Sequence, residues 1–179
     1  MLIDRREGYY LDRIRQYGPN YAGFDWPTSE SVLNLVFTYD LLHQCTARYM
    51  AEFGLSKSTF NVLMLLRHGP PEGMQLHDLG EMLLVSRANI TGLISHLEEK
   101  GYVTREVDEQ DRRARYAKVT AKAEALLDNF IPIHYGNMST LMNDLSATEK
   151  SQLIGLLTKV RNSIKGNAGT CERPVEARL

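Results

Sequence analysis

Apolar residues recur every three to four positions through most of the chain, a pattern that predicts amphipathic α-helices. A short helix is expected near residues 7–17, where Tyr10, Ile14 and Tyr17 share one face. A longer helix should run from Ser31 to Phe53. Gly54 follows it directly, which is typical of a helix end.

A third helix should start after Ser56, whose hydroxyl can cap it, and should stop at the sequence HGPPEG. After residue 120 the helical period returns for about 25 residues, and Pro132 predicts a kink or a break near Ile131. Ser146 and Glu149 then match a capping box before a last amphipathic helix.

Between these helices, residues 75–120 show a different succession of patterns. Two short helical stretches are separated by a turn near Val85–Ser86, and Gly101 stops the second of them. Alternating stretches at 102–107 and 114–119 then predict two strands joined by a polar loop. The expected fold class is mainly α with a small β-hairpin: a winged helix-turn-helix plus a helical dimerisation region.

The second helix of this pair carries side chains suited to DNA rather than to bulk solvent. Small and hydrogen-bonding residues replace the usual Glu/Lys lattice, and Gly92 would let the backbone come close to a groove. Such side chains read base edges or bind phosphates. The candidates are Ser86, Arg87, Asn89, Thr91, Ser95 and His96. The alternative is a solvated helix of unusual composition.

The hairpin tip concentrates arginine. Arg112 and Arg113 lie on it, Arg115 follows at the start of the second strand, and Asp111 could hold Arg113 in place. An arginine on an extended tip can enter the minor groove of DNA. Residues 86–120 contain seven Lys/Arg and six Asp/Glu, so placement rather than bulk charge must produce binding. A solvated hairpin with local ion pairs is the alternative.

Composition adds limits to this picture. The 179 residues suit one domain, the net charge is −1, and no stretch has the apolar length of a membrane span or signal core, so a cytoplasmic protein without a membrane partner is expected. Cys45 and Cys171 lie in unlike settings, which argues against a disulfide. The five histidines show no metal-ligand spacing, and no catalytic motif is present, so neither cofactor nor enzyme activity is expected.

The sequence resembles the MarR family of bacterial transcription regulators over about residues 31–164. The resemblance is carried by Leu76-x-x-Leu79, Ser86-Arg87, Leu97-Glu98-x-x-Gly101, Asp111-Arg112-Arg113 and Val119-Thr120. Departures are Ala123, where the family often has glycine, and the aromatic N-terminal extension. The resemblance implies a homodimeric repressor on a palindromic operator in double-stranded DNA. The expected organisation is an extension at 1–30, a dimerisation region at 31–56 and 120–165, a winged domain at 57–119 and a flexible tail at 166–179.

The resemblance also implies a small-molecule effector, aromatic or anionic. The N-terminal aromatics either pack on the dimer interface or line its pocket, with Tyr17, Trp26, Tyr39 and His43 as candidate ligand contacts. Two other functions remain open: a dimeric adaptor whose winged domain binds protein, and a redox sensor that uses Cys45. Because Cys45 lies mid-helix without an adjacent cation, it is interpreted as a buried core residue.

Overall fold

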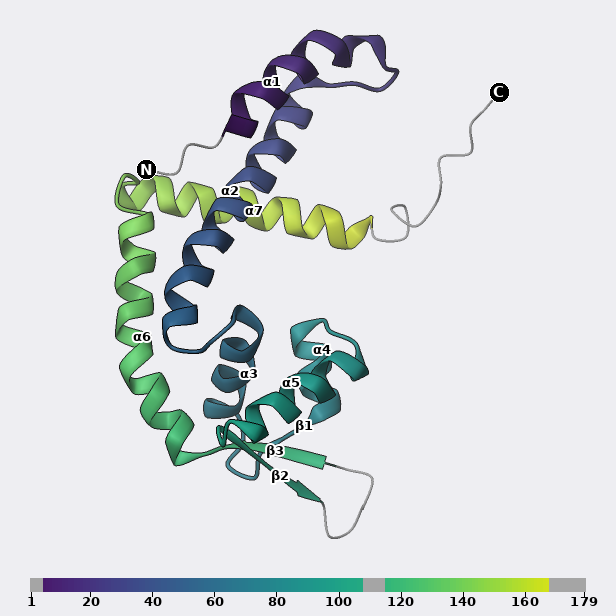
Figure 1. Ribbon diagram of the computed structural model, residues 1–179. Helices are drawn as coiled ribbons and strands as arrows, with labels where there is room; N and C mark the ends of the chain where they lie inside the picture. Colours follow the sequence, from purple (N-terminus) through teal and green to yellow (C-terminus); the bar gives the residue numbers. More distant parts are fainter. Residues whose placement is uncertain (1–4, 108–114, 168–179) are drawn as a thin grey trace. The chain divides into compact units, whose positions relative to one another are not determined.

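Helices make up most of the chain in the computed structural model, which describes residues 5–107 and 115–167 (Figure 1). A small antiparallel sheet completes the fold, in agreement with the expected class. The elements in chain order are α1 (Arg5–Tyr17), the 3₁₀ turn η1 (Gly18–Asn20), α2 (Trp26–Glu52), α3 (Lys57–Arg67), β1 (Met74–Gln75), α4 (Leu76–Leu83), α5 (Arg87–Glu99), β2 (Val103–Val107), β3 (Arg115–Val119), α6 (Ala121–Leu141) and α7 (Ala147–Gly166).

The chain forms two compact units, Met1–Leu127 and Asp128–Leu179. The first holds α1 to β3 and the beginning of α6; the second holds the rest of α6 and α7. In the first unit, α3, α4 and α5 pack with the sheet around a core of fully buried side chains: Val62, Leu63, Leu79, Ile90, Ile94, Leu97 and Val103. The predicted winged helix-turn-helix is therefore confirmed.

The sheet has three strands, in the order β1-β3-β2, whereas the sequence predicted a two-stranded hairpin. The wing strands pair in register from Val103 opposite Val119 to Val107 opposite Arg115. The additional strand β1 sets Met74 opposite Ala117. A strand of two residues is too short to show an alternating pattern of apolar and polar positions, so β1 could not be predicted from the sequence.

Helix α2 begins at Trp26, five residues earlier than the sequence predicted. Asp25 is its N-cap and accepts a hydrogen bond from the backbone N–H of Thr28 at 2.9 Å. Hydrogen bonding from the Thr28 side chain, and then from its backbone, holds the pKa of Asp25 below its ordinary value. Pro27 lies in the first turn of α2, where proline is tolerated because its missing N–H would have no partner within the helix.

Helix α6 continues through Pro132, so of the predicted kink or break near Ile131 the break is not observed. A proline removes one backbone hydrogen bond, and a helix of 21 residues retains the others on either side. The helix ends at Leu141 and α7 follows from the predicted capping box. Glu149 accepts from Ser146 N at 2.8 Å, and hydrogen bonds from Ser146 lower the pKa of Glu149.

Leu84 ends α4 in the left-handed region, with a φ of 53°, and the residue is 93% exposed. That conformation destabilises a residue with a side chain by about 1–2 kcal/mol. Glycine avoids this strain, but its greater conformational freedom in the unfolded chain offsets part of the gain. Leu84→Gly is therefore expected to raise the free energy of unfolding by about 0.5–1 kcal/mol in urea titrations. Leu84→Ala keeps the Cβ atom and should leave stability nearly unchanged; an equal gain in both variants would show that strain at this turn is not the cause.

Candidate nucleic-acid interface

Helix α5 has one buried and one exposed face, and the exposed face holds the predicted contact residues. Ile90, Ile94 and Leu97 point into the core and are essentially inaccessible. Six predicted contact residues lie on α5 or at its N-cap: Arg87, Asn89, Thr91 and His96 are exposed, as is Ser86 at the N-cap, whereas Ser95 is half-buried. The structure thus brings six of the ten predicted DNA contacts together on one helix.

Small residues leave the middle of this exposed face low. A Cβ atom built on Gly92 would meet no neighbour within 4 Å, so the backbone there is open to solvent. Ala88 lies one turn earlier on the same face and is also exposed. A helix with such a surface can lie deep in a major groove, because short side chains let its backbone approach the base edges.

Several hydroxyls of this helix already have partners within it. Ser86 accepts a hydrogen bond from Asn89 N at 3.3 Å and so caps the helix. Thr91 Oγ1 donates to Arg87 O at 2.8 Å, and Ser95 Oγ donates to Thr91 O at 2.9 Å. These hydroxyls are held in fixed positions. The Arg87, Asn89 and His96 side chains are exposed and have no hydrogen bond among the described residues, so they remain available to base edges.

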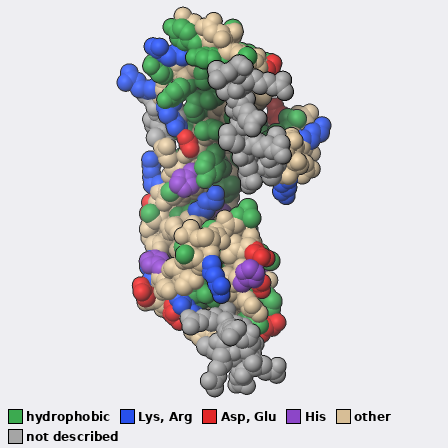
Figure 2. Space-filling view, turned by 90° about the vertical axis from the view of Figure 1, so that its right-hand side faces the viewer, with side chains coloured by type: hydrophobic (Ala, Val, Ile, Leu, Met, Phe, Trp, Pro, Cys, Tyr) green, Lys and Arg blue, Asp and Glu red, His purple; other side chains and the backbone are tan. Residues whose placement is uncertain are grey.

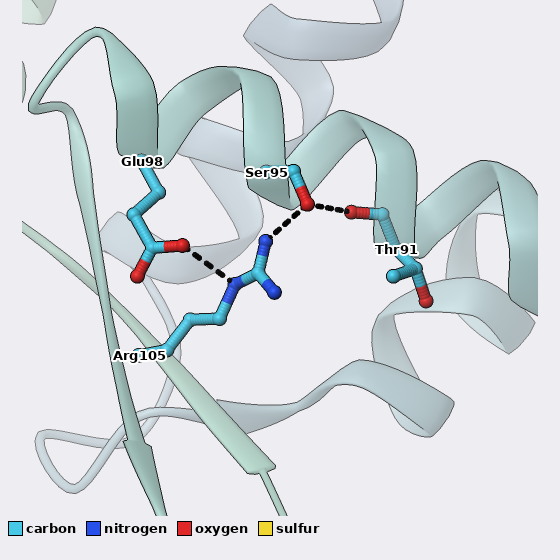
Figure 3. A network of polar contacts seen from close by, with 4 residues as sticks. All are labelled: Thr91, Ser95, Glu98 and Arg105. Carbon is cyan, nitrogen blue, oxygen red and sulfur yellow. Dashed lines mark hydrogen bonds and ion pairs between the residues drawn. The ribbon is translucent and has the colours of Figure 1, made fainter.

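Arg105 of β2 connects the wing to α5 (Figure 3). Its Nη2 donates to Ser95 Oγ, and its Nε lies 3.0 Å from Glu98 Oε2 as an ion pair rather than an aligned hydrogen bond. The Arg105 side chain is only 17% exposed, against 44% for Glu98. Arg105 is therefore a positioning residue: it ties the first wing strand to the helix that carries the candidate contacts.

Arg105 was not among the predicted contact residues, although the sequence contains a signal for its role. Side chains of a strand alternate between its two faces, so Arg105 shares a face with Val103, which is buried. An arginine on the same face of the strand as a buried valine needs polar partners on the element that covers this face. That element is α5, where Ser95 and Glu98 are the partners of Arg105.

The wing strands are further joined by Lys118 and Glu106, whose charged atoms lie 2.7 Å apart. The predicted tip residues Asp111, Arg112 and Arg113 lie outside the described residues, as does the side chain of Arg115. At the base of the wing, Thr120 donates from Oγ1 to Gly101 O at 2.8 Å and caps α6 by accepting from Ala123 N. The two strands thus emerge from a fixed base.

A cavity of about 600 Å³ lies between α1 and the start of α2, and Tyr17 lines it. Phe24 reaches this site because Gly18 has no side chain: a Cβ atom there would lie 2.2 Å from the Phe24 ring. Arg13 lines the same cavity and its guanidinium stacks on the Tyr9 ring at 4.6 Å. The cavity therefore combines aromatic walls with one cation.

The other three predicted ligand contacts do not line this cavity. Trp26 lies under the guanidinium of Arg15, at 4.6 Å. Tyr39 and His43 stack on each other further along α2, with ring centroids 5.9 Å apart, and Lys57 lies over the Tyr39 ring. The structure thus separates the four predicted residues into Tyr17 at the cavity and three residues elsewhere.

Cys45 is half-buried, not fully buried as the sequence suggested, because α2 has faces that this single chain leaves uncovered. Burial, and then the nearby Cys45, raise the pKa of Tyr49.

Within residues 5–107 and 115–167, no group of three or more His, Cys, Asp or Glu side chains could hold a metal ion. In the same residues, no helix has the length and apolar character needed to cross a membrane.

Comparison with known proteins agrees with this geometry. The model of the MarR family matches residues 53–114. The HTH-type transcriptional repressor YetL of Bacillus subtilis (strain 168) is 29% identical over 144 residues, which cover 80% of this chain and 86% of YetL. The transcriptional activatory protein BadR of Rhodopseudomonas palustris (strain ATCC BAA-98 / CGA009) is 32% identical over 131 residues, 70% of this chain and 73% of BadR.

Among solved structures, the S. aureus MepR–DNA complex matches with a TM-score of 0.67 and 25% identity, over 74% of this chain and 96% of the MepR chain. These relatives are regulators rather than enzymes, as the sequence predicted for this chain. A winged helix-turn-helix with an open polar helix face, a matching family model and a relative above 30% identity all lead to one conclusion. The chain belongs to the MarR family of HTH-type transcriptional regulators.

Proposed function

We propose that the protein is a homodimer that binds a palindromic operator and represses transcription until a small aromatic anion releases it. The observation that carries the proposal is the exposed face of α5, where polar side chains flank an open backbone at Gly92. MepR, which shares this fold, is found in complex with DNA. Repression is supported by YetL, a named repressor, while BadR shows that activators occur among the relatives.

The dimer is supported by apolar surface that a single chain leaves exposed. Helix α7 is 20 residues long and has no buried residue, although Leu156, Val160 and Ile164 recur along one side of it. In the first unit, Val32, Val36 and Tyr39 of α2 are about half exposed. Figure 2 shows hydrophobic side chains gathered at the top of the view, where Figure 1 has α1 and the beginning of α2. Exposed apolar faces of this size mark interaction sites, and we expect a second copy of the same chain to cover them.

A dimer also explains why an operator would be palindromic. Two copies related by a two-fold axis present two α5 helices in opposite directions, so each reads the same sequence on opposite strands. The half-sites should lie about one turn of DNA apart. The proposed effector site is the cavity lined by Tyr17, where Arg13 would attract an anion and the aromatic walls a flat ring.

Selection of binding sites from a random DNA pool tests the proposed function. The full-length protein should enrich one palindromic sequence, and DNA upstream of its own gene should contain a copy of it. Asn89→Ala should change the preferred base at one or two positions per half-site, at a cost of about 1–3 kcal/mol for the lost contact. His77→Ala, on the exposed surface of α4, is the matched control and should keep the same consensus.

Absence of any enriched sequence would contradict DNA recognition and favour an adaptor that binds protein. An identical consensus for Asn89→Ala would show instead that the exposed amide does not read bases.

A further inference from the structure

A second cavity, also of about 600 Å³ and open to the surface, lies between α3, β1 and α4 of the winged domain. These three elements lie beside one another in the first unit (Figure 1). Asn61, Met64 and Leu65 of α3 form one wall, Met74 of β1 another, and Met82 of α4 a third. It shares no lining residue with the cavity at Tyr17.

The floor of this cavity is held by close packing around Gly69. A Cβ atom on Gly69 would lie 2.8 Å from Met74 Sδ and 2.8 Å from the carbonyl oxygen of Leu65. Glycine therefore lets the loop after α3 close directly on Met74, whose side chain is 9% exposed. Met82, by contrast, is 62% exposed and forms the rim. The cavity therefore has a closely packed floor and, at its edge, an exposed methionine whose flexible side chain can adapt to a ligand.

The lining chemistry selects one class of ligand. Three of the described lining residues are methionines, whose polarizable thioethers make favourable contacts with aromatic rings. None of the described lining residues is Lys, Arg, Asp or Glu, so a ligand charge would find no fixed counter-charge. Asn61 and His68 supply the polar groups. We propose that this cavity binds uncharged, planar aromatic molecules that carry a hydroxyl or similar hydrogen-bonding group.

Binding at this position would act on the DNA-reading helix through α4. Met82 and Leu83 line the cavity, Leu84 forms the strained turn, and Ser86 then begins α5. A ligand that favours one placement of α4 against α3 therefore favours one placement of α5. This regulatory step rests on the proposed function, whereas ligand binding itself does not.

The test follows the methyl signals of the seven methionines by NMR in the full-length, ¹³C-methyl-methionine-labelled protein. The probe is 2-naphthol, uncharged at neutral pH, titrated to its solubility limit. Met64, Met74 and Met82 should shift with one common dissociation constant, while buried Met50 should not follow them. The anion 2-naphthoate, of similar size, should bind here at least tenfold more weakly.

A saturated analogue, 2-decalol, tests the aromatic part of the proposal and should also bind more weakly than 2-naphthol. Met82→Lys places a cation on the exposed rim without disturbing the core, and should weaken 2-naphthol binding at least tenfold. Leu84→Lys is the control, because its side chain is exposed and does not line the cavity; it should bind 2-naphthol as the wild type does.

Unshifted methyl signals at Met64, Met74 and Met82 would overturn the site, and equal binding of 2-naphthoate or 2-decalol would overturn the ligand class. The regulatory step is measured separately as the change in operator affinity at saturating 2-naphthol. Unchanged affinity would overturn that step alone. Failure to bind any operator would overturn the proposed function while leaving the NMR result to decide the ligand site.

Discussion

Leu156→Asp is expected to convert the proposed dimer into monomers and, with it, to remove tight operator binding. Leu156 is 60% exposed on α7, in line with Leu153 and Val160. Burying such a side chain is worth about 1.5–3 kcal/mol, and a two-fold axis places each substitution in the interface twice. Dimerisation should weaken by about 3–6 kcal/mol, roughly 10²- to 10⁴-fold, as measured by sedimentation equilibrium.

Asn162→Asp is the matched control, because it adds the same charge to the opposite side of the same helix, where the side chain is exposed. This variant should remain a dimer with unchanged operator affinity. A wild-type monomer at micromolar concentration, or a Leu156→Asp protein that is still dimeric, would remove α7 from the interface.

The parts of the fold that the sequence predicted well are those with a repeating pattern or a local cap. Helix α5 has four apolar positions in register with the helical period, and its start is marked by the N-cap Ser86. The capping box at Ser146 was also predicted from the sequence and is confirmed. These features depend on residues within one turn of each other, so no knowledge of the tertiary structure is needed to find them.

Features that depend on contacts between distant segments were not predicted. Strand β1 exists because Met74 and Gln75 pair with β3 some forty positions later, and Gln75 Nε2 donates to the Tyr116 hydroxyl at 3.0 Å. The cavity between α3, β1 and α4 also joins segments apart in the chain, with Met74 of β1 in its lining. The partial exposure of Cys45 likewise depends on surface that one chain does not cover.

The candidate site divides in the same manner. Its α5 residues could be read from the polar face of one helix, whereas the link between Arg105, Ser95 and Glu98 joins a strand to a helix. The sequence pattern predicted Arg112, Arg113 and Arg115 of the wing as DNA contacts, and Arg105 was not among them. The structure separates Arg105, which is mostly buried and paired, from the tip arginines that the sequence places between the strands.

This separation gives a paired prediction for Arg113 and Arg105. Arg113→Ala should weaken operator binding by about 1–3 kcal/mol and reduce the slope of log K against log salt by about one, because a tip arginine that contacts a phosphate displaces a counterion. Arg105→Lys keeps the charge but loses the geometry that holds Ser95 and Glu98 together. It should lower operator affinity and thermal stability together while leaving the salt slope unchanged.

Fluorescence anisotropy with labelled operator at several salt concentrations, together with thermal unfolding of each variant, measures both effects. Arg112→Ala extends the series and should show the Arg113 effect to a smaller degree. An unchanged affinity in both tip variants at fixed salt would rule out a DNA-contacting wing. A reduced salt slope in Arg105→Lys would show that this side chain leaves Glu98 to bind phosphate, and that the wing is positioned by other contacts than those of Arg105.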